Sequence, residues 1–221
     1  MMRTAILLFC GAFVLTLFYR GTQSKVVTNT DLLKHFKDIE PTALHIWFKS
    51  SRTMSGKFQG AQLDILYFPL FGDYMNSSKQ YYTDPKTGIK KYCGYYLFPS
   101  YKFIVNDHLT GLILRGPSQY DESRISLWLY DRRKDTLTES VELADGFGDE
   151  NWYFNKDSWI EYINNEVRII SRQIDHEINE KTMVDNITSD KFAFYKLEND
   201  AFKKIDTIEI DKKEYKLFNE K

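Results

Sequence analysis

The residues of this 221-residue chain whose types and spacing could support chemistry are concentrated in one acidic segment, Asp-Gly-Phe-Gly-Asp-Glu at residues 145–150. Its carboxylates, Asp145, Asp149 and Glu150, could hold Ca²⁺ through oxygen ligands, or two of them could form the acid/base pair of a glycoside hydrolase. The spacing does not match the EF-hand pattern. Because turns between strands are rich in Gly and Asp, we expect an ordinary loop without a resident metal or cofactor, and keep calcium binding and hydrolysis as alternatives.

A second candidate site is a group of tyrosines in residues 80–98, which we expect to form a hairpin. Alternation along its second strand places Tyr92 and Tyr96 on one face and Tyr95 on the other. An exposed aromatic row could stack on a sugar or anchor a protein partner. In the simpler alternative, the tyrosines only cover a sheet and keep their hydroxyls in water. With a tryptophan from the aromatic stretch at 152–154 added, the predicted binding residues are Tyr81, Tyr82, Tyr92, Tyr95, Tyr96 and Trp152.

Other catalytic arrangements find little support. The histidines, His35, His45, His108 and His176, show no metal-binding spacing such as H-x-x-x-H, so we expect no zinc site. We expect His176 in a solvated loop and Cys93 as a buried strand thiol. The sequence contains no G-x-S-x-G elbow, no P-loop and no G-x-G-x-x-G fingerprint.

The composition argues against a nucleic-acid-binding protein and favours a β-sheet fold. Lys and Arg number 30 and Asp and Glu 31, a formal net charge of −1, which is unlike the basic footprint of a nucleic-acid binder. Hydrophobic residues make up 43% of the chain, enough to build a core. Aromatic residues reach 16%, and aromatic side chains favour pleated, half-buried surfaces.

The N-terminus carries an export or anchoring signal. After Arg3, residues 4–19 form an uncharged apolar run of 16 residues. A spanning helix needs about 20 residues and a signal-peptide core has about 7–15, so the run lies between the two. Residues 1–24 are therefore predicted to be a cleaved signal peptide, a retained anchor that contacts the membrane through residues 4–19, or a segment lipidated at Cys10. In each case we expect the body outside the cytoplasm, in the periplasm, on the cell surface or secreted.

Residues 25–221 predict a single β-rich extracytoplasmic domain with one short N-terminal helix. Thr30 can cap this helix, an apolar stripe that includes Phe36 and Ile39 follows, and Pro41 ends it. The turn signals are residues 84–88, Asn164-Asn165 and Asn199-Asp200. The predicted strands and hairpins are 43–50, 62–68, 80–98, 101–105 with 111–115, 124–130 with 136–143, 158–163 with 166–172, and 191–197 with 201–210.

A weak internal repeat refines the fold prediction. Residues 127–143 align without gaps with residues 192–208, which suggests two related units, 101–143 and 158–208. Each unit would be a four-stranded meander, typical of one propeller blade, but a propeller has at least about four blades. We therefore predict an all-β fold, an antiparallel hairpin meander arranged as two packed sheets or one strongly curved sheet.

These observations favour a non-catalytic binding module of the cell envelope, with a protein or a glycan as its partner and no nucleic acid. The alternative is an extracytoplasmic hydrolase that acts on glycans through the carboxylates of residues 145–150. A purely structural envelope component is a third hypothesis. The hydrolase requires two carboxylates within about 5–10 Å of each other in a cleft, whereas the binding module requires an exposed aromatic row.

Overall fold

The computed structural model describes residues 27–47, 60–76, 81–92, 96–118, 124–149, 151–164 and 166–211. The predicted leader, Cys93, Tyr95 and Glu150 lie outside these ranges. The helices are α2 (Asn29–Leu33), the 3-10 helix η1 (Ile65–Phe71) and α3 (Asp73–Asn76). The strands are β1 (Lys37–Asp38), β2 (Leu44–Trp47), β3 (Tyr81–Thr83), β4 (Lys90–Tyr92), β5 (Phe98–Ile104), β6 (Leu109–Gly116), β7 (Arg124–Asp131), β8 (Thr136–Asp149), β9 (Trp152–Ile163), β10 (Glu166–Asn179), β11 (Val184–Glu198) and β12 (Ala201–Glu209).

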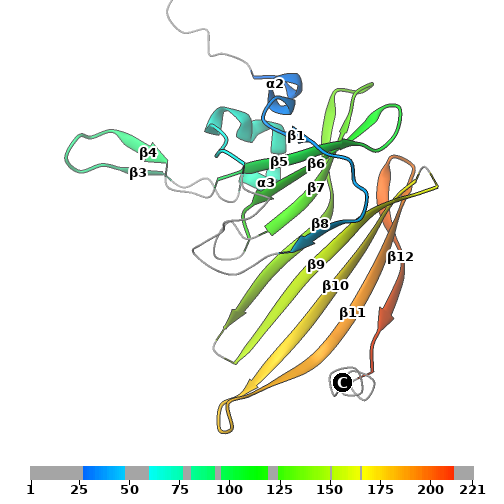
Figure 1. Cartoon of the computed structure of the whole chain (residues 1–221). Helices are drawn as coiled ribbons and strands as arrows, with labels where there is room; N and C mark the ends of the chain where they lie inside the picture. Colours follow the sequence, from blue (N-terminus) through cyan, green and yellow to red (C-terminus); the bar gives the residue numbers. More distant parts are fainter. Residues whose placement is uncertain are drawn as a thin grey trace, which may run out of the picture.

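Ten of the described strands form one open sheet in the order β1-β5-β6-β7-β8-β9-β10-β11-β12, with β2 added beside β9 (Figure 1). From β5 to β12 every strand is antiparallel to the next one in the chain, which confirms the predicted hairpin meander. The two segments of the suggested repeat correspond to consecutive stretches of this meander, β5–β8 and β9–β12. Strands β3 and β4 form a separate hairpin.

Strand β8 is the corner of the sheet. Its first part, residues 136–144, pairs with β7, and its last part, residues 145–149, pairs with β9. Two register shifts interrupt the β7–β8 pairing, and such irregularities bend and twist a sheet. The first half of the sheet, β5 to β8, thereby faces the second half, β8 to β12. The main core between the halves comprises Ile46, Phe103, Val105, Leu109, Ile113, Ile125, Leu127, Leu129, Val141, Leu143, Ala144, Ile160, Val167, Ile169 and Phe202.

A second core covers the opposite face of the first half. Helix α2 and η1 contribute Leu32, Phe68 and Phe71, which pack against Trp128 of β7. Strands β6 and β7 are thus buried on both faces, which explains why their sequences contain nearly continuous apolar runs. The predicted helix and strongly curved sheet are both present, and together they form three layers.

Two predicted elements are wrong. Residues 62–68 were expected as a strand, but Asp64 accepts a hydrogen bond from the Leu66 amide and starts η1. The N-terminal helix starts at Asn29 and is capped by Thr28, not Thr30. It ends at Leu33 because the chain then turns to pair β1 in parallel with β5.

The predicted turn chemistry is confirmed at three hairpins. Asn164, Asn199 and Asp200 have φ values of 52°, 51° and 64°, the left-handed conformation that tight hairpins require. Gly88 has φ 67° in the β3–β4 turn. These residues allow the tight turns that set the register of the strands on either side.

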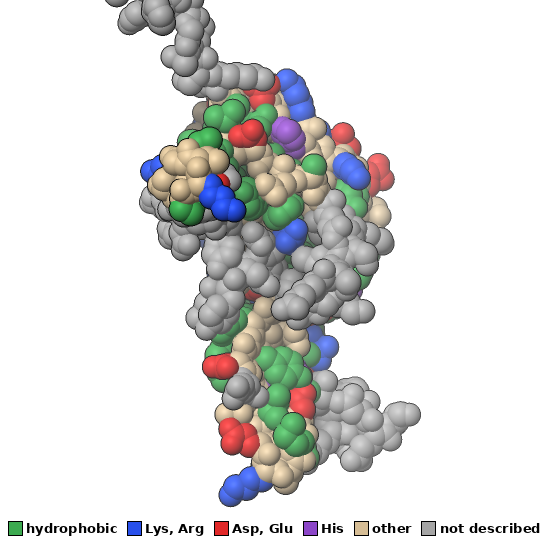
Figure 2. Space-filling model, turned by 90° about the vertical axis from the view of Figure 1, so that its left-hand side faces the viewer, with side chains coloured by type: hydrophobic (Ala, Val, Ile, Leu, Met, Phe, Trp, Pro, Cys, Tyr) green, Lys and Arg blue, Asp and Glu red, His purple; other side chains and the backbone are tan. Residues whose placement is uncertain are grey.

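The second half of the sheet extends far beyond the core (Figure 1). Strands β9, β10 and β11 have 12, 14 and 15 residues, against about 5–6 in an ordinary strand. On the side seen in Figure 2, hydrophobic and acidic side chains alternate along this long lower part. None of the described helices is long and apolar enough to cross a membrane, and the predicted span at residues 4–19 lies outside the described ranges.

Candidate functional site

The acidic segment that the sequence offers for chemistry is a strand end, not a loop. Residues 145–149 form the last part of β8, in which Asp145 pairs with Lys156 and Asp149 with Trp152. Asp145 is only 4% exposed and accepts hydrogen bonds from the Ser118 hydroxyl at 2.6 Å and the Gly146 amide at 2.8 Å. Its carboxylate is therefore held in a structural network and is closed to solvent.

The two described carboxylates of this segment do not converge. Asp145 and Asp149 lie four residues apart along one face of β8, which separates their backbones by roughly 13 Å. The carboxyl pairs of glycoside hydrolases lie about 5–10 Å apart. Glu150, the third candidate, lies outside the described residues. The described geometry thus gives the hydrolase alternative no support.

The predicted aromatic binding residues occupy different environments. Tyr96 is half-buried and packs edge-on against Phe68, with ring centroids 6.4 Å apart. Trp152 is 46% exposed and contacts Phe147 edge-on at 5.2 Å. The backbones of Tyr81, Tyr82 and Tyr92 lie in the β3–β4 hairpin, whereas their side chains and all of Tyr95 lie outside the description. A binding role for this group stays a prediction.

A different aromatic group lies on the face of the second half that points away from the main core. Strand β2 buries Ile46 in the core, so alternation turns His45 and Trp47 outward. His45 lies opposite Trp159 of β9 and stacks on it, with ring centroids 4.6 Å apart and planes 1° from parallel. The Trp47 ring lies 5.1 Å from His45 at an angle of 36° and is 43% exposed. We call His45, Trp47 and Trp159 the outer aromatic surface.

Polar groups border the outer aromatic surface. The Asp157 carboxylate lies 2.8 Å from Nε2 of His45 and is partly exposed. Across the sheet, Arg172 lies opposite Asp157 and also holds Asp190, with its Nε and a terminal nitrogen 2.9 and 2.7 Å from the two carboxylate oxygens. The Arg172 guanidinium also covers the ring of Phe192 at 5.3 Å. Aromatic faces and hydrogen-bonding groups therefore occur side by side on this face.

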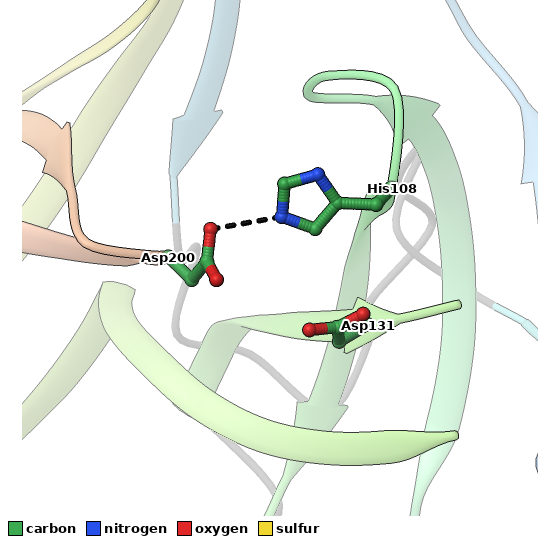
Figure 3. Close-up of side chains that lie close together, drawn as sticks. All are labelled: His108, Asp131 and Asp200. Atoms are coloured by element: carbon green, nitrogen blue, oxygen red, sulfur yellow. Dashed lines mark hydrogen bonds and ion pairs between the residues drawn. The ribbon is translucent and has the colours of Figure 1, made fainter. Parts of the chain in front are cut away.

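A third group joins three turns at one end of the sheet (Figure 3). His108 comes from the β5–β6 loop, Asp131 from the end of β7 and Asp200 from the β11–β12 turn, and one potential ligand atom of each lies within 4.8 Å of the others. Nε2 of His108 lies 2.8 Å from the Asp200 carboxylate. The Lys134 ammonium lies 3.2 Å from Asp131 and 3.5 Å from Asp200, and Arg133 also pairs with both.

Both carboxylates of this group are held in the ionised form. Burial raises the pKa of Asp131, but the backbone amides of Arg133 and Lys134 and the Lys134 ammonium outweigh burial and lower it. The pKa of Asp200 is lowered chiefly by the hydrogen bond from His108. Histidine spacing could not reveal this group, because its members are up to 92 residues apart and meet only when the sheet curves.

The expectation that His176 lies in a solvated loop is wrong. It lies in β10, its side chain is only 12% exposed, and its ring stacks on Tyr153 at 4.1 Å. The Tyr153 hydroxyl donates a hydrogen bond of 2.5 Å to Asp185, which also lies 3.1 Å from Nδ1 of His176. The hydrogen bond to Asp185, aided by burial, raises the pKa of Tyr153 to about 12.

Replacing Asp185 with Asn should lower the pKa of Tyr153 from about 12 toward the ordinary value of 10.0. The folded state favours the neutral phenol of Tyr153. The Tyr153 hydroxyl therefore stabilises the fold fully below about pH 10, and this contribution is lost as the pH rises to about 12. NMR titration of ¹³Cζ-labelled tyrosine measures the pKa directly. His176→Ala is the control and should leave it near 12; an unchanged pKa in Asp185→Asn would contradict the assignment.

Comparisons of the chain with protein-family models, with curated proteins and with solved structures found no match.

Proposed function

We propose that this chain is a non-catalytic binding module of the cell envelope and that its ligand is a glycan bound on the outer aromatic surface. The observation that carries the proposal is the group of three aromatic rings on the outward face of the sheet, in which His45 stacks on Trp159 and contacts Trp47. The envelope location is supported by the apolar run at residues 4–19.

The chemistry of this surface suits a sugar. The apolar faces of a pyranose ring pack on flat aromatic rings, and its hydroxyls need donors and acceptors at the ring edge. Asp157 offers an acceptor beside the rings. Among the described residues beside the rings, Arg172 is paired with the buried Asp190, so its charge is already balanced and attracts a nucleic acid or another polyanion only weakly. These features favour a neutral glycan over a charged polymer.

A carboxylate pair for hydrolysis has no such support among the described residues. Asp145 is buried in its own hydrogen bonds, and no mechanism that uses it as an exposed acid or base follows. The proposed module therefore holds its ligand without cleaving it.

The test is a glycan array probed with the full-length protein, followed by titration calorimetry on any hit. Trp47→Ala and Trp159→Ala should each weaken binding at least about tenfold, since buried aromatic contacts dominate such interfaces. Trp152→Ala is the matched control, because Trp152 is also exposed but lies on the opposite face of β9. An array without hits, or full binding by the Trp47 and Trp159 variants, would refute the proposal; loss of binding only in Trp152→Ala would move the site to that residue.

A further inference from the structure

The meeting point of three turns has the composition of a metal site (Figure 3). It brings together one imidazole nitrogen and one carboxylate oxygen from each of two aspartates, all within 4.8 Å. Nitrogen and oxygen atoms that bind one Zn²⁺ ion lie at most about 4.4 Å apart, because each metal–ligand distance is about 2.0–2.2 Å. Small rotations of His108, Asp131 and Asp200 would suffice for coordination.

Asp131 is the residue that points to a cation. Its side chain is 7% exposed, and its Oδ1 accepts hydrogen bonds from the Arg133 and Lys134 amides at 2.8 and 3.2 Å. Those bonds fix the position of the carboxylate. Oδ2 is buried and faces the Lys134 ammonium at 3.2 Å, which is the cation that balances its charge in this structure. A buried anionic oxygen is costly without a cation beside it, so an ion that enters this site has to take the place of Lys134.

The other two ligands are also held in place before any ion arrives. The Asn106 side chain accepts hydrogen bonds from the His108 and Leu109 amides at 3.0 and 2.8 Å, which shapes the β5–β6 loop. Asp200 is fixed in a left-handed turn with φ 64°. The ligands therefore come from rigid turns, which reduces the entropy lost on binding.

The natural competitor of an ion is Lys134. Its ammonium sits between the two carboxylates at 3.2 and 3.5 Å, yet its side chain is 59% exposed. It can therefore swing into solvent and leave the two carboxylates to a divalent cation. Arg133 is equally exposed and lies farther than Lys134 from Asp131, at 3.8 Å, and about as far from Asp200, at 3.4 Å.

We propose that His108, Asp131 and Asp200 bind a divalent transition-metal ion, of which Zn²⁺ and Mn²⁺ are the best candidates, and that the ion displaces Lys134. An imidazole ligand favours these ions over Ca²⁺ and Mg²⁺, which prefer ligand sets of oxygen alone. The bound ion cross-links the β5–β6 loop and β7 of the first half to the β11–β12 turn of the second half. It thereby clamps the open sheet shut at this end.

The test is thermal unfolding of the full chain, first treated with EDTA and then titrated separately with ZnCl₂, MnCl₂ and CaCl₂. A ligand that binds only the folded state raises the unfolding temperature in a saturable way. We expect such a rise with Zn²⁺ or Mn²⁺ and a weaker one with Ca²⁺. Lys134→Met keeps all three ligands and removes the competing charge, so the Kd of the ion should fall about tenfold.

Two matched variants locate the site. His108→Gln should abolish the saturable rise, while His176→Gln, which alters another histidine paired with an aspartate, should keep it. Should His108→Gln fail to fold, the Co²⁺ absorption spectrum of Lys134→Met reports imidazole ligation in a protein with all ligands intact. Absence of a saturable response in both the wild type and Lys134→Met would overturn the proposal, as would a response lost in His176→Gln but kept in His108→Gln.

Discussion

Replacing Trp128 with alanine should lower the free energy of unfolding by about 3–5 kcal/mol. Trp128 is 4% exposed and stands on the face of β7 that the helices cover. Its ring meets Phe71 at 5.1 Å and Tyr74 at 5.2 Å, both edge-on. The alanine variant loses these contacts and leaves a large cavity, because the surrounding sheet can collapse only in part. The same change should loosen η1 and α3 from the sheet.

Urea denaturation followed by far-UV circular dichroism measures this effect. Trp152→Ala is the matched control, since Trp152 is 46% exposed and its loss should cost no more than about 0.5 kcal/mol. The stability of Trp128→Phe should fall between the two, because it keeps an aromatic ring and removes an indole N–H that has no hydrogen-bond partner among the described residues. Equal stabilities for the alanine variants at 128 and 152 would show that the helical layer adds little to the fold.

Most of the strands were predictable because their signals are local. Alternation and turn residues are read within a few positions, and the left-handed turn at Asn199 and Asp200 lies where those residue types require it. The long apolar runs of β6 and β7 agree with the burial of both faces of these strands. The number of hairpins left two alternatives, two packed sheets or one strongly curved sheet, since so many strands cannot stay flat and still bury a core.

The mistakes arose where one residue type serves two purposes. Gly146 and Gly148 suggested a loop, but the chain continues there as a strand. A Cβ at Gly148 would lie 2.2 Å from Cβ of Tyr153, so glycine permits the close approach of two paired strands. Likewise, the apolar residues at 65–71 fit both a strand and a helix, and the spacing of Phe68 and Phe71 by three residues decided for the 3-10 helix.

The candidate sites could not be predicted from the sequence because they depend on contacts between distant segments. His45 meets Asp157 only because β2 inserts beside β9, 112 residues later in the chain. His108 and Asp200 meet only because β8 turns the second half of the sheet onto the first. His45, His108 and Asp200 lay in predicted strands or turns, and Asp157 lies just before the predicted strand 158–163. Local patterns carry no information on which hairpin ends come together.

Replacing Arg172 with methionine should cost about 3 kcal/mol of stability, the second large effect we expect. Asp190 is 2% exposed, and both of its oxygens are held by the Arg172 guanidinium. Without that partner its charge stays buried and uncompensated, which is far costlier than the loss of an ion pair in water. Arg172 itself is 27% exposed, so water can reach part of the space it leaves, and we expect the lower end of the usual range.

The double variant Arg172→Met/Asp190→Leu separates a buried charge from lost packing. Replacing both partners of a buried pair with apolar groups is often nearly neutral, so the double variant should recover most of the loss in chemical denaturation. Lys191→Met supplies the surface control: its pair with Glu209 at 3.5 Å is about half exposed and should contribute less than about 1 kcal/mol. A double variant less stable than Arg172→Met would show instead that Asp190 is stabilised by other groups. Because Arg172 also covers Phe192, the recovered double variant can then be tested for glycan binding, which separates the stability of this face from its capacity to bind.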